Sequence, residues 1–408
     1  MLLSLGLILT LGFIGGYLFS KIKIPGLVAM IIVGLIIGPY FLNLIDASIL
    51  NISAEMRQIA LIIILTRSGL NLDLASLKQI GRPAILMSFI PATLEIIGIT
   101  IAAHLLLGLS IFEALLLGAV IAAVSPAVVS PRMINLIEKG YGSENEVPKL
   151  VLAGSSIDDI YVIVLFYAFL GLAKTNSFNA VTMLSIPLSI VLGIALGIVG
   201  GLLISVIFKK TNFLNAVNVL IVLMTSFLFV GLENILKAYV PISALLAIIV
   251  LAMTILLMNK KKAEALSKGY KVLWLVFEII LFVLVGATLD LSYAFSNIGP
   301  ALLVLLIGLI FRAAGVLLSV MFTRFTLKEK VFIVLAYLPK ATVQASIGGI
   351  ALSMGLASGA IILTVSIISI FVTAPIGAFL IEYFGPKFLK KADDVDLENA
   401  HLVEEVPS

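Results

Sequence analysis

The sequence predicts an all-α polytopic membrane protein with thirteen transmembrane helices. Three observations support this fold class: the composition, the length of the apolar stretches and the placement of basic residues between them. Hydrophobic residues make up 62% of the 408 residues and charged residues only 12%, whereas about a quarter of a typical soluble domain is charged. Because no packed core could hide this much apolar surface from water, lipid must be the solvent for most of the chain.

Each apolar stretch is long enough to span the hydrocarbon of a bilayer, which is about 30 Å thick. Backbone polar groups find no water inside lipid, so each stretch should be helical. The first stretch lacks a basic start, which favours a retained helix over a cleaved signal peptide. The predicted spans are residues 1–20, 25–44, 55–72, 83–107, 111–136, 146–172, 180–208, 213–238, 241–258, 270–290, 298–322, 329–355 and 357–383.

The basic residues predict the orientation. With the N-terminus outside, most of the 26 Lys and Arg residues fall in the inner connections, and the outer connections hold only Lys174 and Lys237. A miscounted span would move every later loop to the opposite side and destroy this asymmetry. We therefore expect a multi-pass protein of the cell membrane with a cytoplasmic C-terminus. The same asymmetry, rather than nucleic-acid binding, explains the pI near 9.0.

The chain is expected to form one membrane transporter unit over residues 1–386, followed by an acidic cytoplasmic tail over residues 387–408. The tail could be regulatory, although such tails are most often simply solvated. The chain has no cysteine, and its two histidines, His104 and His401, lie far apart. A disulfide or a thiolate metal site is therefore excluded, and neither a histidine metal site nor a cofactor is expected.

Five ionisable side chains lie near the middle of four predicted spans. Glu95 is on span four, Asp158 and Asp159 are on span six, Arg312 is on span eleven and Lys340 is on span twelve. A charge at this depth costs roughly 2.5–3.5 kcal/mol on insertion scales, so such residues usually have a function. Ion pairs that fix helix register would explain one acid and one base. They do not explain two adjacent carboxylates, which repel each other.

Helical geometry separates the two aspartates. Neighbouring helical residues project about 100° apart, so one aspartate can face a cation pocket while the other faces a base such as Arg312. Ser155 lies one turn earlier and can offer a hydroxyl oxygen. Hard cations prefer oxygen ligands, and a dehydrated carboxylate also binds protons well. We expect Na⁺ to bind at Asp159 and Asp158, where competition with protons is the minimal chemistry for exchange.

Proline interrupts two of the predicted spans. Span five has Pro126 and Pro131 at membrane depth, and span twelve has Pro339. Proline removes a helical hydrogen bond and clashes with the preceding turn, so both helices should unwind. Ser125 at the first break can then supply an oxygen ligand. The breaks lie seven spans apart, as expected for an inverted repeat of helices 1–6 and 8–13 with the seventh as a linker.

The remaining mid-span charges can be assigned from their depth. Lys340 lies beside a break, where half-helix ends bring negative partial charge into the membrane, so we expect it to compensate these ends. Arg312 cannot realistically deprotonate and serves as a fixed countercharge. Glu95 is its natural partner, with Asp158 in competition. Glu278 lies deep in span ten and receives no role.

Three motifs resemble those of a known family. Residues 154–159 (Gly-Ser-Ser-Ile-Asp-Asp) resemble the paired-aspartate signature of the cation/proton antiporter superfamily. Residues 124–129 (Val-Ser-Pro-Ala-Val-Val) and 338–345 (Leu-Pro-Lys-Ala-Thr-Val-Gln-Ala) look most like the NHA subgroup of sodium/proton exchangers. The resemblance covers nearly the whole chain, and the last of these strings is specific.

The resemblance implies roles for individual residues. Asp159 is similar to the family's essential cation- and proton-binding carboxylate, and Asp158 to its neighbour. Arg312 stands where many bacterial relatives have a lysine, and in the NHA subgroup this arginine pairs with a glutamate that matches Glu95. The resemblance also implies a homodimer in which a core domain, with the crossed helices, moves against a dimerisation domain by elevator-like alternating access.

The predicted function is secondary transport of Na⁺ or Li⁺ in exchange for H⁺, and not an enzymatic reaction. An intramembrane aspartyl protease needs two aspartates that face each other across a water, which adjacent residues do not provide. A K⁺/H⁺ exchanger, a potassium channel and a sodium-coupled organic-anion symporter are the alternatives. Expected partners are monovalent cations, protons, membrane lipid and a second copy of the chain, but not nucleic acid. Because buried carboxylates that repel each other hold protons well, activity should rise with pH.

Overall fold

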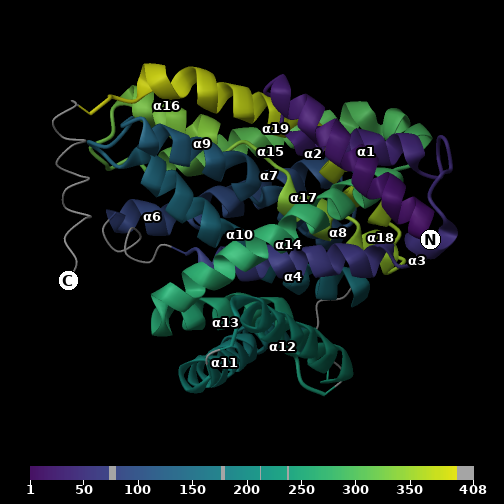
Figure 1. The fold of residues 1–408 in the computed structure, drawn as a ribbon. Coiled ribbons are helices and arrows are strands. Elements are labelled where there is room, and N and C mark those ends of the chain that lie inside the picture. The colour runs from purple at the N-terminus through teal and green to yellow at the C-terminus, as the bar shows by residue number, and fades with distance from the viewer. Residues whose placement is uncertain (73–79, 176–179, 212, 237–238, 393–408) are drawn as a thin grey trace.

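The computed structural model describes residues 1–72, 80–175, 180–211, 213–236 and 239–392. Most of the predicted acidic tail therefore lies outside the described residues. Every regular element within them is a helix, and the only β-type contact there is an isolated antiparallel bridge between Tyr141 and Lys391. The predicted all-α fold class is confirmed (Figure 1).

The helices follow the predicted spans in order. Nine helical segments among the described residues are long and apolar enough to cross a membrane, and α2 and α13 are shorter apolar helices. Each of the thirteen predicted ranges contains a helix, while the number of crossings stays a prediction. The helices are α1 (Leu2–Lys21), α2 (Gly26–Ile37), α3 (Ala47–Asn51), α4 (Ser53–Leu70), α6 (Arg82–Met87), α7 (Ile90–Leu107), α8 (Ile111–Ala122), α9 (Pro126–Glu138), α10 (Val147–Thr175), α11 (Ala180–Lys210), α12 (Asn215–Leu236), α13 (Ala244–Met258), α14 (Lys260–Ala287), α15 (Leu291–Ser319), α16 (Leu327–Ala336), α17 (Thr342–Ile347), α18 (Ile350–Ser353) and α19 (Gly359–Phe388).

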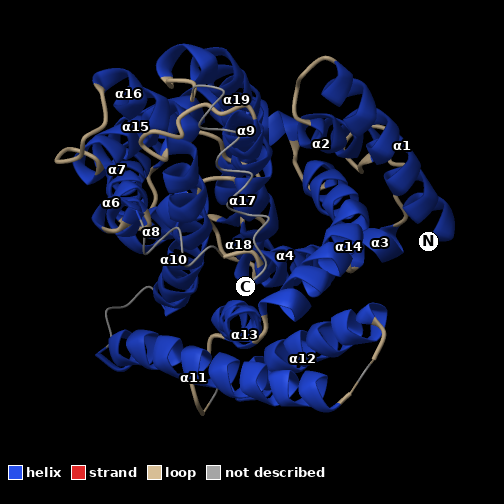
Figure 2. Cartoon of the chain, turned by 60° about the vertical axis from the view of Figure 1, so that its left-hand side comes forward, coloured by secondary structure: helices blue, strands red, loops and turns tan. Residues whose placement is uncertain are grey.

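The helices form two groups, which Figure 2 shows at the upper left and along the right and bottom of the molecule. We call α6–α10 with α15–α19 the site bundle, and α1–α4 with α11–α14 the scaffold. Within the site bundle α7 packs against α15, and α8 and α9 pack against α10. Within the scaffold α14 packs against α2 and α4, and α11 packs against α13. One place where the two groups meet is the contact of α17 with α4 and α14.

Helix contacts support the inverted repeat. In the predicted repeat, spans two, three and four correspond to spans nine, ten and eleven. The contact between α2 (span two) and α14 (span ten) is then equivalent to the contact between α13 (span nine) and α4 (span three), and both are present. Helix α7 (span four) packs against α15 (span eleven), its own counterpart. Such exchanged pairs follow from a two-fold relationship between the halves.

Two glycines allow α2 and α14 to approach closely. A Cβ at Gly34 would overlap the carbonyl oxygen of Val283, and a Cβ at Gly286 would overlap the carbonyl oxygen of Ile31. Lipid is as apolar as leucine, so van der Waals packing rather than hydrophobic burial holds membrane helices together, and small residues permit it. The α2–α14 contact therefore depends on the absence of side chains at both positions.

The end of α19 is tied to the loop between α9 and α10. The backbone N–H of Gly142 donates to the carbonyl of Lys390 at 2.8 Å, and the N–H of Ala392 donates to the carbonyl of Gly140 at 2.9 Å. These bonds lie on either side of the isolated bridge. Both segments belong to the site bundle, so the last described residues are attached to the site bundle.

Gly34→Ala should lower thermal stability because the added methyl group must push α14 away from α2. Overpacking of this kind costs roughly 1–3 kcal/mol. Gly231→Ala on α12 is the matched control, since a Cβ there meets nothing within 4 Å and alanine is the better helix former. Thermal unfolding of the purified protein in detergent makes the comparison. Equal unfolding temperatures for the two variants would contradict the close contact.

Candidate functional site

Two helices break and cross inside the site bundle. Residues 123–125 separate α8 from α9, and residues 337–341 separate α16 from α17. The backbone N–H of Ser125 donates to the carbonyl of Pro339 at 2.8 Å, so the two unwound segments touch each other. The first break directly precedes Pro126 and the second contains Pro339, as predicted, whereas Pro131 lies inside α9 and does not interrupt it.

Three successive carbonyls at the end of α8 receive hydrogen bonds from span twelve. Nε2 of Gln344 donates to Ile121 at 3.0 Å and to Ala123 at 2.8 Å, and Nζ of Lys340 donates to Ala122 at 3.2 Å. The end of a helix leaves such carbonyls without partners in its own backbone, and their partial negative charge attracts a cation. Side chains of the second broken helix thus donate hydrogen bonds to the free carbonyls at the end of α8.

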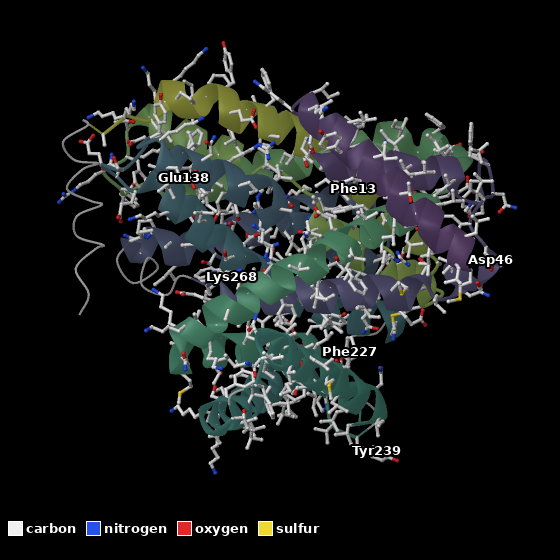
Figure 3. The ribbon with its side chains drawn as sticks, viewed as in Figure 1. Phe13, Asp46, Glu138, Phe227, Tyr239 and Lys268 are labelled. Carbon is white, nitrogen blue, oxygen red and sulfur yellow. The ribbon has the colours of Figure 1, made fainter. Side chains whose placement is uncertain are left out.

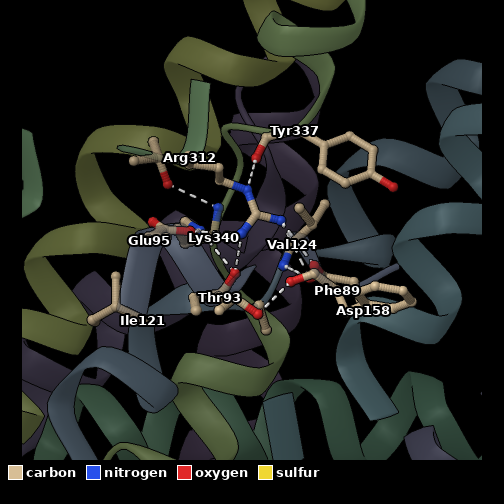
Figure 4. Close-up of polar contacts among 12 residues, drawn as sticks. Phe89, Thr93, Glu95, Ile121, Val124, Asp158, Arg312, Tyr337 and Lys340 are labelled. Carbon is tan, nitrogen blue, oxygen red and sulfur yellow. Dashed lines mark hydrogen bonds and ion pairs between the residues drawn. The ribbon is translucent and has the colours of Figure 1, made fainter. Parts of the chain in front are cut away.

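Arg312 on α15 joins the buried charges (Figure 4). Its Nη1 lies 2.6 Å from Oε2 of Glu95, and its Nη2 lies 3.2 Å from both oxygens of Asp158. Its Nε donates to the carbonyl of Tyr337 at 2.7 Å, and Nη1 also donates to the carbonyl of Ala122. The side chains of Arg312 and both acids have no exposed surface. One guanidinium therefore links α7, α10 and α15 to both breaks.

Lys340 contacts the same carboxylate as Arg312. Its Nζ lies 2.6 Å from Oε2 of Glu95, and its backbone N–H donates to Oγ1 of Thr373 on α19 at 2.8 Å. Glu95 thus lies between two cations, and its charge offsets the repulsion between them. The contact with Thr373 fixes the backbone of the second break to α19.

The buried mid-span charges of the site bundle balance except at one residue. Arg312 and Lys340 pair with Glu95 and Asp158, and these four groups are neutral as a set when all are ionised. Asp159 is 4% exposed, forms no ion pair with the described residues, and has a buried Oδ1 without a hydrogen-bond partner. A buried carboxylate without a counterion is strongly disfavoured. Asp159 must therefore carry a proton or meet a cation from solution.

The two adjacent aspartates have different surroundings. Oδ2 of Asp158 accepts a hydrogen bond from the backbone N–H of Val124 at 2.9 Å, in addition to the bonds from Arg312. Asp158 is thus fixed to the first break and to α15. Asp159 has neither partner. The rotation of about 100° between neighbouring helical residues separates a fixed carboxylate from a free one.

Other oxygens in and around the breaks are available to a ligand. Ser125 and Ser155 are buried, and Oγ of Ser125 has no hydrogen-bond partner. Oγ of Ser155 donates to the carbonyl of Leu152 in its own helix at 3.1 Å and can still accept a bond. Oε1 of Glu95 is also without a partner. In the part of the chain that the structure describes, no group of three or more His, Cys, Asp and Glu residues is arranged to hold a metal ion.

Three residues of the site have no role in the sequence-based prediction. Gln344 lies in the motif over residues 338–345, and a buried amide at mid-span is costly enough to have drawn attention. The ring of Tyr337 lies 5.3 Å from the Arg312 guanidinium, within the range of a cation–π contact. Tyrosine and threonine occur widely in membrane helices, so neither Tyr337 nor Thr373 gives a signal in the sequence.

A cavity between the two helix groups approaches the first break. It has a volume of about 550 Å³, and its wall includes Tyr17, Met30 and Glu278 of the scaffold and Ala127 and Arg132 of the site bundle. A second cavity of about 420 Å³ shares Arg132 with the first. The walls of both include Lys23 and Arg132, which belong to the connections predicted to be inside. Figure 3 shows Glu138 of the site bundle and Lys268 of the scaffold towards this end of the molecule. Glu278, which has no predicted role, lines this cavity.

Broken helices that cross around buried charges are typical of secondary transporters, and the fold and the site together define this class. Residues 7–384 match the family described as sodium/hydrogen exchanger, transmembrane. Sodium/hydrogen exchanger 9B2 of Homo sapiens is 34% identical over 405 residues, which cover 93% of this chain and 74% of that protein. Sodium/hydrogen exchanger 9B1 of Mus musculus is 33% identical over 420 residues, which cover 95% and 72%. The chain belongs to the sodium/hydrogen exchanger family.

A solved structure has the same fold. The sodium proton antiporter MjNhaP1 from Methanocaldococcus jannaschii, determined at pH 8, superimposes with a TM-score of 0.80 over 93% of this chain and 96% of that one. The two sequences are 23% identical, and the likeness is one of fold. Together with the family match, it confirms the predicted membership in the cation/proton antiporter superfamily.

Asp158→Asn and Asp159→Asn should differ in their effect on stability. Asp158→Asn removes one partner of a buried ion pair, which costs about 3–5 kcal/mol. Asp159→Asn removes the uncompensated charge of the site bundle and should leave stability unchanged or raise it. Thermal unfolding in detergent at about pH 8, where carboxyls in water are ionised, measures both. The variants are matched in chemistry and position, so equal losses of stability would contradict the charge balance.

Proposed function

We propose that this chain is a secondary active antiporter that exchanges Na⁺ or Li⁺ for H⁺ at Asp159. The observation that carries the proposal is the charge balance at mid-span, where Asp159 is the one described ionisable group of the site bundle without a countercharge. A proton and a monovalent cation each supply that charge, and both cannot occupy one carboxylate readily. The human and mouse relatives are named sodium/hydrogen exchangers, which supports sodium as the cation.

In the proposed mechanism the cation approaches through the larger cavity, whose wall at Ala127 adjoins the first break. It loses water and binds Asp159, with further oxygens from Asp158, Ser125 and Ser155. The proton on Asp159 leaves as the cation binds. An empty, ionised Asp159 is disfavoured inside the bundle, so the bundle changes its orientation only when it carries a cation or a proton. This restriction couples the two fluxes.

Arg312 and Lys340 act as fixed charges in this mechanism. Arginine does not release its proton in proteins. Both side chains hold the carbonyl end of α8 and the carboxylate of Glu95, and neither contacts Asp159 in the described hydrogen bonds and ion pairs. Lys340 is proposed to keep its proton because its Nζ pairs with Oε2 of Glu95 at 2.6 Å. With both charges constant, one cation replaces one proton. The proposed exchange is therefore one for one and moves no net charge.

We propose that the protein works as a homodimer in the cell membrane, with its N-terminus outside and its C-terminus in the cytoplasm. The scaffold is the part proposed to contact the second copy while the site bundle moves. Exposed apolar side chains on α1 and α12, among them Phe13, Leu228 and Ile235, support contact of this part with lipid or with a partner. Transported ions are the only ligands that the mechanism requires, and no cofactor takes part.

Purified protein in liposomes with an imposed pH gradient and a pH-sensitive dye tests the exchange. Sodium or lithium should release the gradient in the parent protein and not in Asp159→Asn. Asp290→Asn, a change at the start of α15 outside the buried cluster, is the control and should retain activity. Potassium and choline are added separately, and a response to potassium alone would indicate K⁺/H⁺ exchange. Absence of any cation response in correctly inserted protein would refute the proposal and favour sodium-coupled uptake of an organic anion.

The dependence of sodium transport on pH tests whether one carboxylate binds both ions. Protons that compete with sodium at Asp159 should raise the sodium concentration needed for half-maximal rate, by up to about tenfold per pH unit while the site is mostly protonated. The rate at low sodium should therefore rise with pH. Initial rates measured from about pH 6 to pH 9 at several sodium concentrations provide the check. A half-maximal sodium concentration that stays constant over this range would contradict a shared site.

A further inference from the structure

The interface between the site bundle and the scaffold, which we call the seam, contains cavities at one end and is packed at the other. At the predicted inner end, cavities separate residues of α1, α2 and α14 from residues of α9 and α19. Beyond the second break, towards the opposite end, α17 packs against α4 and α14. The loop charges predict this end to be outside. The structure thus has a seam that is open inside and closed outside.

Arg57 lies at the closed end, one turn into α4. It is 6% exposed, and its Nε donates to the carbonyl of Ser53 in the same helix at 3.2 Å. Its Nη1 is buried and has no hydrogen-bond partner. Arg57 forms no ion pair with any described residue, and the nearby acid on its own helix, Glu55, is exposed. The scaffold therefore buries a guanidinium here without a counterion.

The guanidinium of Arg57 reaches across the seam to Gly349, which lies between α17 and α18. A Cβ at position 349 would overlap Nη1, and it would lie 3.0 Å from Cζ and 3.2 Å from Nη2. A side chain at position 349 would therefore displace the guanidinium from this contact. Gly349 follows the helical segment that carries Gln344, so the contact connects the scaffold to the second broken helix.

The cost of burying this guanidinium destabilises the contact between Arg57 and Gly349. An N–H without a partner and a charge without a counterion are both disfavoured away from water. If the outer end of the seam opened, the same group would be hydrated. The closed outer end is therefore less stable than the same contact would be with an apolar side chain of similar length.

We propose that Arg57 and Gly349 form the outer contact of alternating access, and that the buried guanidinium weakens this contact enough for the outer end to open. The inference rests on the proposed exchange mechanism and adds a residue that sets the balance between its two states. Arg57 acts on this balance through the contact between α4 and span twelve. Its effect should therefore appear in the conformational equilibrium.

A thiol reporter can measure the state of the inner end. The chain has no native cysteine, and Ala127→Cys places one thiol in the wall of the inner cavity. The rate at which a maleimide alkylates this thiol, in purified protein in detergent, rises with the fraction of time that the inner end is open. The measurement needs no transport signal, so a failure of this inference is distinguishable from a failure of the proposed function.

Arg57→Met keeps the length of the side chain and removes its charge. It should stabilise the closed outer end and raise the alkylation rate roughly threefold to tenfold. Arg57→Lys keeps a charge and should remain within about twofold of the parent. Gly349→Ala displaces the guanidinium and should lower the rate by a comparable factor. Beside Arg57→Ala, where the space is empty, Gly349→Ala should have no effect.

The opposite signs of these effects make the test decisive. Whichever state predominates in the parent, at least one of the two variants can shift the balance measurably. Equal rates for the parent, Arg57→Met and Gly349→Ala, or a slower rate for Arg57→Met, would overturn the proposal. If Arg57→Met does not fold, the direction of the Gly349→Ala effect and its loss beside Arg57→Ala decide the question.

Discussion

The structure depends on the requirement that buried charges find their partners within the bundle, because lipid supplies no counterion. Arg312 meets this requirement for several elements at once. It binds Glu95 on α7 and Asp158 on α10, and it donates to carbonyls at both breaks. The unwound segments persist in the membrane because these donors, together with Lys340 and Gln344, replace the lost helical bonds. The same groups that make the site therefore hold the two broken helices together.

In the proposed mechanism, neutrality of the paired charges leaves Asp159 as the group that binds the ion. Had the site bundle contained one more base, a sodium ion at Asp159 would have had no charge to balance. Had it contained one more acid, the site would have needed a second ion. Asp159 is also the one aspartate of the pair without a backbone partner, so a ligand can bind it without breaking the contacts of Asp158. Under this proposal, Asp158 stabilises the bundle, whereas the adjacent Asp159 binds the ion.

Breaks in single helices could be predicted from the sequence, whereas contacts that depend on how each helix is turned about its own axis could not. Proline is unfavourable in a helix interior, so Pro126 and Pro339 predict both breaks, although Pro131 lies within α9 without interrupting it. The position of Glu95 along its span places it at the same membrane depth as Arg312. Depth does not show which way a side chain faces around the helix axis, so it cannot decide whether Glu95 or Asp158 pairs with Arg312. The structure shows both acids bound to the guanidinium. The contacts of Gln344 with α8 and of Arg57 with Gly349 join segments far apart in the sequence, and no local pattern encodes them.

The attachment of the end of α19 to the loop between α9 and α10 has a mechanical consequence. Because the backbones of Lys390 and Ala392 are hydrogen-bonded to Gly142 and Gly140, the last described residues follow the site bundle in any movement that separates it from the scaffold. A fluorescent label at position 391 would therefore report the position of the site bundle without disturbing the buried charges.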